Sequence, residues 1–230
     1  MTTYVLIHGA GDVGWYWHLV EAELQARGHD VIAPDLPCED ESAGLTDYAD
    51  TVVRAIGNRS GLVVVAQSFG GYTAPLVCDR VPADLLVLVA GMVPLPGESA
   101  MEMFEHTGYA QPTDEDAPAL SETDSLIATF LHDVPRTLAL EALSKGKDQA
   151  ATPMEEPWPL DAWPEVPTKY VLCRNDRLFP ADWMRRVVRE RLSIEPDEIK
   201  SGHCPALSRP VELADRLEGY RAELGKTIGS

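Results

Sequence analysis

The ten residues LVVVAQSFGG, Leu62–Gly71, predict how the chain folds. Leu62–Ala66 is a continuous apolar run, which is typical of a strand covered on both faces of a parallel sheet. Phe69–Arg80 has a helical pattern, which Pro75 should kink. Ser68, between strand and helix, is expected on a sharp turn above the carboxyl ends of the strands, where open α/β sheets bind ligands. The stretch therefore predicts a serine nucleophile; the alternative is an ordinary turn with a capping serine.

Similar strand and helix patterns alternate along the rest of the chain. The other expected strands are Tyr4–Ile7, Val31–Ala33, Leu85–Ala90, Tyr170–Cys173 and the short Asp197–Ser201. The other helical patterns are Trp15–Arg27 (ending at Gly28), Thr46–Ile56 (Thr46 as N-cap), Pro180–Leu192 and Val211–Leu224 (after Pro210). This alternation predicts an α/β fold with a mostly parallel, doubly wound sheet and right-handed crossovers.

One long stretch between two of these strands, Pro94–Pro167, contains no strand-like run. It carries two helical patterns, Asp124–Leu131 and Pro135–Lys145, and many acidic residues near its start. An acidic, unstructured loop is the alternative, but its apolar residues favour packing: Met101, Met103, Phe104, Leu126, Ile127, Phe130 and Leu131. We expect one domain, with a core at residues 1–94 and 166–230 and a helical cap inserted at 95–165.

Composition narrows the range of partners. The 230 residues include 19 basic and 37 acidic side chains, a net charge of −18. Such a field repels nucleic acid and anionic membranes, so we expect a small-molecule substrate. Four cysteines without a C-x-x-C pair, and no leader pattern, favour a reduced cytoplasmic protein without a metal.

A glycine-containing motif, His8-Gly9-Ala10-Gly11, follows the first expected strand. The glycines permit close backbone approach, and the N–H groups of Ala10 and Phe69 can form an oxyanion hole. His8 is interpreted as a structural residue that holds the turn. Gly70 lets the helix approach the strand, and Ala66 stands where similar turns more often have glycine.

A base and an acid for Ser68 come from two later loops. His203, in Ser201-Gly202-His203, is the histidine of six that lies in a loop at the correct end of the sheet. Asp176, in CRNDRLFP, follows a strand and precedes a helix. Asp35 also follows a strand but precedes Ser68, so it is read as a turn residue. Asp176 can orient His203, which takes the proton of Ser68.

With these residues the chain resembles the α/β-hydrolase superfamily, closest to small serine esterases related to the plant methylesterase and hydroxynitrile lyase group. The motifs that carry the resemblance are HGAGDVGWYW at 8–17, DLP at 35–37, AQSFGG at 66–71, NDRLFP at 175–180 and GH at 202–203. The order Ser68, Asp176, His203 is that of the superfamily. The resemblance implies a helical cap and no metal or organic cofactor. The lyases carry Thr and Lys where this chain has Gly9 and Cys204, which favours an esterase.

The sequence thus predicts a carboxylic-ester hydrolase for a small or medium, mostly apolar ester. Thioesterase, perhydrolase, acyltransferase and hydroxynitrile lyase chemistry, or a non-catalytic ligand-binding role, are the alternatives. Candidates to line the pocket are Trp15, Met92, Met103, Leu131 and Cys204, together with Trp17, Trp158 and Trp163. The substrate and the oligomeric state are open at this level.

Overall fold

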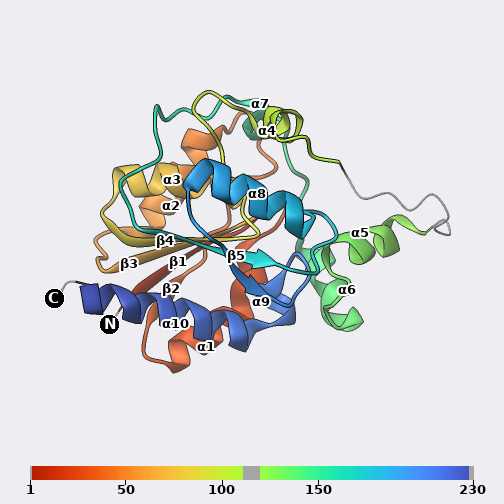
Figure 1. Cartoon of the computed structure of the whole chain (residues 1–230). Helices are drawn as coiled ribbons and strands as arrows, with labels where there is room; N and C mark the ends of the chain where they lie inside the picture. The colour runs from red at the N-terminus through yellow and green to blue at the C-terminus, as the bar shows by residue number, and fades with distance from the viewer. Residues whose placement is uncertain (1, 111–119, 228–230) are drawn as a thin grey trace.

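A six-stranded parallel sheet forms the centre of the protein, seen in a computed structural model that describes residues 2–110 and 120–227 (Figure 1). The strands are β1 (Thr3–Ile7), β2 (Asp30–Ile32), β3 (Leu62–Gln67), β4 (Ala83–Val89), β5 (Thr168–Cys173) and β6 (Asp197–Ile199). Their order is β2-β1-β3-β4-β5-β6, and every adjacent pair is parallel. The predicted fold class is confirmed, and all six expected strands are present.

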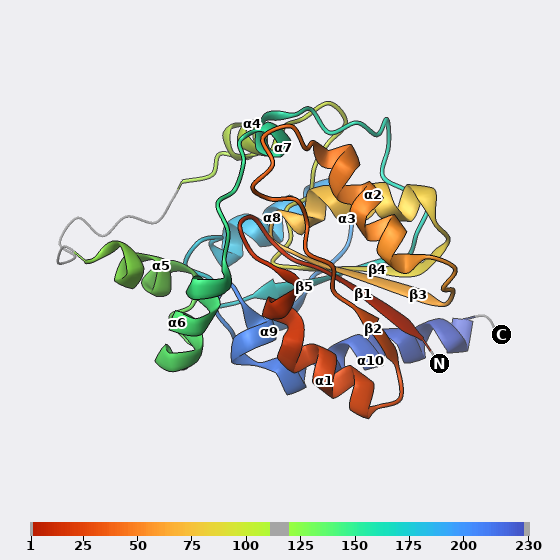
Figure 2. The ribbon, with the colours of Figure 1, turned by 180° about the vertical axis from the view of Figure 1, so that it is seen from behind.

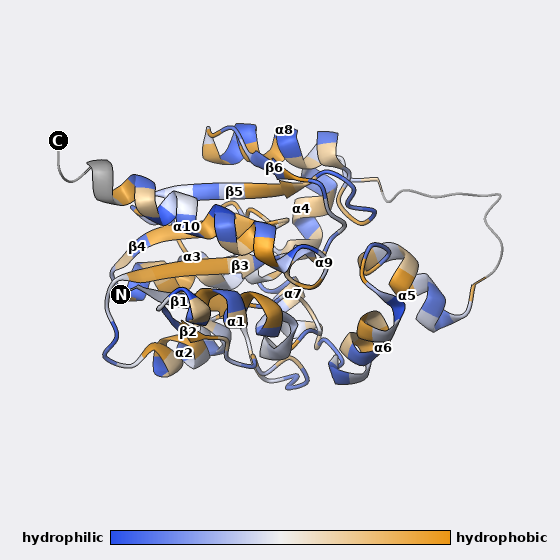
Figure 3. Cartoon of the chain, turned by 90° about the horizontal axis from the view of Figure 1, so that it is seen from below, coloured by the Kyte–Doolittle hydropathy of each residue, from blue (hydrophilic) through white to orange (hydrophobic). Residues whose placement is uncertain are grey.

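Helices cover both faces of this sheet, as Figures 1 and 2 show. One face carries α1 (His18–Ala26) and α10 (Pro210–Thr227), and the other carries α2 (Leu45–Ile56), α3 (Gly70–Arg80) and α8 (Ala181–Leu192). Along β3, Val63 and Val65 pack on the first face and Val64 and Ala66 on the second. Both faces are therefore apolar, which explains the continuous hydrophobic runs and the apolar strands of Figure 3.

Several helix boundaries differ by a few residues from the expected ones, and two of the differences have a local cause. A 3-10 turn, Gly14–Trp17, precedes α1, and Gly28 follows it with φ +86°, as a C-terminal glycine should. Helix α2 begins one residue before Thr46, because the Asp47 carboxylate accepts from the N–H of Gly44. Thr46 is thus within the helix and is not its N-cap. No helix in the described part of the chain is both long and apolar enough to cross a bilayer.

The insertion between β4 and β5 contributes two pairs of helices among the described residues. They are α4 (Ala100–His106), α5 (Glu122–Phe130), α6 (Arg136–Lys145) and α7 (Thr152–Glu155). Figure 2 shows α4 beside α7, and α5 with α6 at the end toward which the strands point. The sequence predicted α5 and α6 but not the short α4 and α7, although Ser99 and Glu102 form a capping box at the start of α4. The expected cap includes residues 111–119, which lie outside the described residues.

A buried ion pair anchors the start of the insertion to the core. Glu98, just before α4, pairs with Arg191 on α8, and their side chains are only 3% and 7% exposed. Both guanidinium Nη atoms bond to the carboxylate, with 2.9 Å between Arg191 Nη2 and Glu98 Oε1. His106 adds a contact of 2.8 Å to the same carboxylate. Burial alone would raise the pKa of Glu98, but the bonds from Arg191 and His106 keep it below its usual value. The ionised pair therefore joins α4 to α8.

We predict that Arg191→Met lowers the free energy of unfolding by about 3–5 kcal/mol, because it leaves a buried carboxylate without its cation. Urea unfolding at neutral pH measures this loss. The matched control is Arg189→Met on the same helix, since the Arg189–Glu195 pair is exposed and should contribute less than about 1 kcal/mol. Equal losses in the two variants would contradict the anchoring role of Glu98.

Candidate functional site

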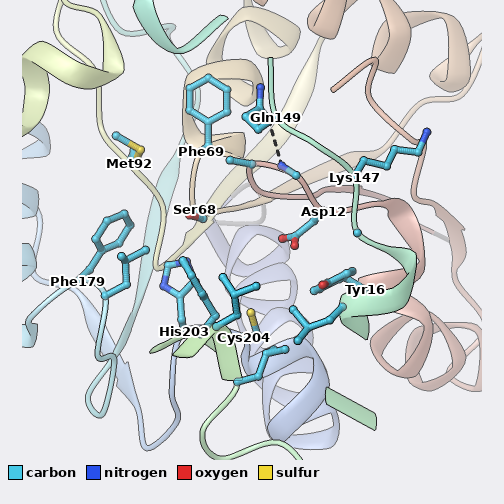
Figure 4. Close-up of a pocket in the computed structure, with 18 of the residues that line it drawn as sticks. Asp12, Tyr16, Ser68, Phe69, Met92, Lys147, Gln149, Phe179, His203 and Cys204 are labelled. Atoms are coloured by element: carbon cyan, nitrogen blue, oxygen red, sulfur yellow. Dashed lines mark hydrogen bonds between the residues drawn. The ribbon is translucent and has the colours of Figure 1, made fainter. Parts of the chain in front are cut away.

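Ser68 stands on a strained turn between β3 and α3. Its φ of +52° lies in the left-handed region, which is unfavourable for a residue with a side chain. Its N–H donates to Val89 O at 3.3 Å, and its carbonyl accepts from Gly71 N at 3.0 Å and Met92 N at 2.9 Å. These bonds from the end of β4 hold the turn, so that the Ser68 side chain faces the cavity above the sheet (Figure 4).

Two glycines after Ser68 allow α3 to lie against neighbouring backbone. A Cβ on Gly70 would come within 2.7 Å of His8 O, and one on Gly71 within 2.1 Å of Met92 O. Any side chain at these positions would force the helix away from β1 or from the loop after β4. The expected close approach at Gly70 is therefore present, and Gly71 is packed more tightly still.

The acid and base candidates from separate loops meet beside Ser68. His203 Nδ1 lies 2.7 Å from Asp176 Oδ2, and both side chains are at least 97% buried. The other carboxylate oxygen of Asp176 accepts from the N–H groups of Leu178 and Phe179 at 2.8 and 3.0 Å. Because Asp176 is fixed, Nδ1 of His203 donates to it and Nε2 is left for the cavity. Burial lowers the pKa of His203, but Asp176 outweighs this effect and raises it above 6.5.

The insertion ties the two loops together. In the turn between α5 and α6, the Asp133 carboxylate accepts from Gly202 N at 2.8 Å, and His132 Nε2 contacts Asn175 O at 2.9 Å. From the sheet, Gln67 Nε2 donates to His203 O at 3.2 Å. Phe130 and Phe179 place their rings edge-on to His203, at centroid distances of 5.7 and 5.1 Å. The imidazole is thus held by core and insertion together.

The loop after β1 lies where the sequence predicted an oxyanion hole. In the described residues, no hydrogen bond engages the N–H of Ala10 or of Phe69, and both residues line the cavity. Gly11 has φ +67°, and its N–H donates to Gln149 Oε1 at 3.1 Å (Figure 4). A Cβ on Gly9 would lie 2.6 Å from Gln67 Oε1, so a larger residue here would have to displace the Gln67 side chain.

Two residues of these loops have structural roles. Buried His8 accepts at Nε2 from Leu36 N at 3.0 Å, and its Nδ1 contacts Gly9 O. Asp35 accepts from Gly14 N at 2.7 Å. Both residues therefore hold turns, in agreement with their interpretation from the sequence.

A cavity of about 500 Å³ opens above Ser68. Its size is typical of small-molecule sites. The apolar lining residues are Phe69, Met92, Phe104, Leu126, Phe130, Leu131, Leu143, Met154, Leu178 and Phe179. Among the described residues, no group of three or more His, Cys, Asp or Glu is placed to hold a metal ion. The cavity thus suits a mostly apolar organic molecule.

The predicted pocket residues fall into two groups. Met92, Leu131 and Cys204 line the cavity, whereas Trp15 and Met103 do not. Trp15 stacks on His18 with 4.2 Å between the ring centroids and Lys145 over its ring, and Met103, on α4, is fully buried in the core. Their assignment to the pocket was wrong, because neither ring stacking nor the orientation of α4 can be read from composition. Trp17, Trp158 and Trp163 also lie outside the cavity wall.

Asp12 and Tyr16 are cavity residues that the sequence analysis missed. Asp12 lies in the loop after β1, and its carboxylate and the Tyr16 hydroxyl line the cavity together. Desolvation raises the pKa of Asp12 to about 7, although the proximity of His203 lowers it. The one feature of the sequence that could have indicated a cavity position is that Asp12 comes only two residues after Ala10.

The fold and this arrangement define a class: an α/β protein with a serine on a strand-to-helix turn and a His–Asp pair beside it. A family model described as "Alpha/beta hydrolase family" matches residues 4–216. The chain therefore belongs to the alpha/beta hydrolase family.

Several characterised proteins are similar to this chain over nearly its whole length. Methylesterase 7 of Arabidopsis thaliana is 26% identical, covering 93% of this chain and 94% of its own. Norfluorocurarine synthase 1 of a Strychnos species is 25% identical, covering 94% and 93%. The crystal structure of polyneuridine aldehyde esterase superposes with a TM-score of 0.80 at 19% identity, covering 96% of this chain and 99% of that one. The structural likeness concerns the fold.

We predict that Gly71→Ala destabilises the protein by about 1–3 kcal/mol, because its Cβ would overlap backbone at Met92. Thermal or urea unfolding measures this. The control is Gly219→Ala on α10, where a Cβ meets nothing within 4 Å; it should stabilise by about 0.5–1 kcal/mol. If Gly71→Ala unfolds like the unaltered protein, the close approach is not required.

Proposed function

We propose that the protein hydrolyses carboxylic esters through an acyl-enzyme on Ser68. The single observation that carries the proposal is the 2.7 Å His203–Asp176 contact beside a strained serine, all opening on one apolar cavity. The relatives named as methylesterases support ester hydrolysis over the other chemistries that the same residues can perform.

The geometry supports a two-stage reaction. Neutral His203 accepts the Ser68 proton at Nε2 while Ser68 Oγ attacks the ester carbonyl. The N–H groups of Ala10 and Phe69 stabilise the oxyanion, each contributing roughly 10²–10³-fold. Asp176 keeps the imidazole oriented and stabilises its protonated form. His203 then protonates the leaving alcohol, and water, activated in the same way, releases the acid.

The insertion acts as a cap in this proposal. Residues of α5 and α6, among them Leu126, Phe130 and Leu143, form cavity wall and favour a small or medium, mostly apolar ester. Excluding water strengthens the electrostatic interactions around the oxyanion. The four free cysteines suit a reducing compartment, and we propose the cytoplasm.

A fluorophosphonate probe together with p-nitrophenyl esters from acetate to octanoate tests the proposal. We expect wild-type protein to label and turn over, and Ser68→Ala to lose labelling and on the order of 10³-fold or more of kcat/KM. Ser144→Ala, at an exposed position on α6, is the control and should behave as wild type. A folded wild type that neither labels nor hydrolyses any of these esters would contradict the proposal.

The pH profile tests the His203–Asp176 pair. Since the base must be neutral, kcat/KM should rise with pH through a midpoint above 6.5, the unperturbed histidine value. Asp176→Asn removes the charge that raises the pKa of His203, so the midpoint should move to lower pH while the rate falls by about 10²–10⁴-fold. An unchanged midpoint would show that Asp176 does not set the titration of the base.

A further inference from the structure

Asp12 points its carboxylate into the cavity beside the nucleophile. Figure 4 shows it between Ser68 and Tyr16. A Cβ added to Gly9 would lie 3.1 Å from Asp12 Oδ2 and 3.0 Å from Ser68 Cβ, so the two side chains are close to one another. The carboxylate is therefore close to the place where the carbonyl of an ester would sit.

This carboxylate has no fixed counter-ion. In the part of the chain that the structure describes, no lysine or arginine forms an ion pair with Asp12. Lys147 lines the same cavity, but its ammonium lies 3.5 Å from Glu39, and Figure 4 shows it turned away from Asp12. The other nearby group that can carry a positive charge is His203, and it has to be neutral to act as the base. An unpaired carboxylate in an apolar cavity is costly, and a cation from the ligand would remove that cost.

The two sides of the cavity differ in character. Met92 and Phe179 lie on one side of Ser68, and Asp12, Tyr16 and Cys204 lie on the other (Figure 4). An ester bound at Ser68 thus places one half among apolar side chains and the other beside a carboxylate. The net charge of −18 also raises the local concentration of cations.

We propose that Asp12 selects esters that carry a positively charged nitrogen a few bonds from the scissile carbonyl. This inference rests on the proposed ester hydrolysis and names its substrate class. The short separation between Asp12 and Ser68 limits the spacing, so an amino or quaternary ammonium group two to four atoms from the ester is the required pattern. Tyr16, beside Asp12 in the cavity wall, adds aromatic surface for such a cation.

Two isosteric pairs of esters test this inference. The first pair, butyrylcholine and 3,3-dimethylbutyl butyrate, places the charge in the alcohol half. The second, methyl 4-(trimethylammonio)butanoate and methyl 5,5-dimethylhexanoate, places it in the acyl half. We expect wild-type kcat/KM, corrected for alkaline hydrolysis rates, to favour the cation about tenfold or more in at least one pair. Asp12→Asn, which keeps the side-chain shape, should bring that ratio close to one.

Asp148→Asn is the matched control. Asp148 also lines the cavity but is exposed, so its removal should leave the ratio as in wild type. Equal wild-type rates within both pairs would overturn the inference. A ratio that is unchanged in Asp12→Asn would also overturn it. So would an equal loss of the ratio in Asp148→Asn, because it would indicate that the preference arises from the overall negative charge of the protein. If Asp12 served only His203, Asp12→Asn would slow both members of a pair equally.

A binding measurement separates this inference from the proposed catalysis. In the Ser68→Ala protein, calorimetry should show tighter binding of a cationic ester than of its isostere, and Asp12→Asn should remove the difference. Tighter cation binding without turnover by wild type would leave the inference standing while the proposed function fails. Ester turnover by wild type, with equal binding of both members of a pair, would support the proposed function and contradict the inference.

The pH dependence of the ratio gives a second readout. The pKa of Asp12 is raised to about 7, so the cation preference should grow as the pH rises through that value. The groups that face Asp12 are His203, Tyr16, Cys204 and Cys38. His203 affects both esters alike, and burial raises the pKa values of Tyr16, Cys204 and Cys38, so the ratio reports Asp12. A ratio that does not vary with pH would count against the pairing.

Discussion

The carbonyl oxygen of Ser68 accepts two backbone hydrogen bonds, from Gly71 at 3.0 Å and from Met92 at 2.9 Å. A serine at φ +52° costs on the order of 1–3 kcal/mol and persists only where its surroundings enforce it. Here the loop after β4 supplies one bond and the first turn of α3 the other. The glycines of that turn let the helix lie on the neighbouring backbone. Each further feature of the site is positioned relative to this turn.

The rest of the site is assembled across several elements. Phe69 of the same turn lines the cavity, as does Ala10 of the loop after β1. His203 arrives from another edge of the sheet and is fixed by Gln67 of β3 and, through Gly202, by Asp133 of the insertion. The insertion therefore forms cavity wall and also orients the imidazole. This dual role couples the shape of the cavity to the geometry of the base.

The sequence predicted the strands and the loops of the site more completely than it predicted the residues that line the cavity. Strands such as Leu62–Gln67 were recognisable because burial on both faces makes them continuously apolar. Ser68, Asp176 and His203 were predicted to lie together because each follows a strand and parallel strands end at one edge, and the structure brings them together. Met103 was misassigned because the orientation of a short helix depends on tertiary contacts such as the Glu98–Arg191 pair, and Trp15 was misassigned because its ring stacks on His18. Asp12 was passed over because its loop gave no sign that the side chain turns inward.

Asp176 and Asp12 lie near the same imidazole in different surroundings. Asp176 accepts two backbone N–H bonds and the bond from His203, so its charge is satisfied within the protein. Among the described residues, no lysine or arginine pairs with Asp12, and desolvation raises its pKa to about 7. Since environment sets the role of each carboxylate, Asp176 is held in place beside His203, whereas Asp12 faces the cavity. A positively charged ligand would therefore satisfy the charge of Asp12, as the protein's own N–H groups and His203 satisfy the charge of Asp176.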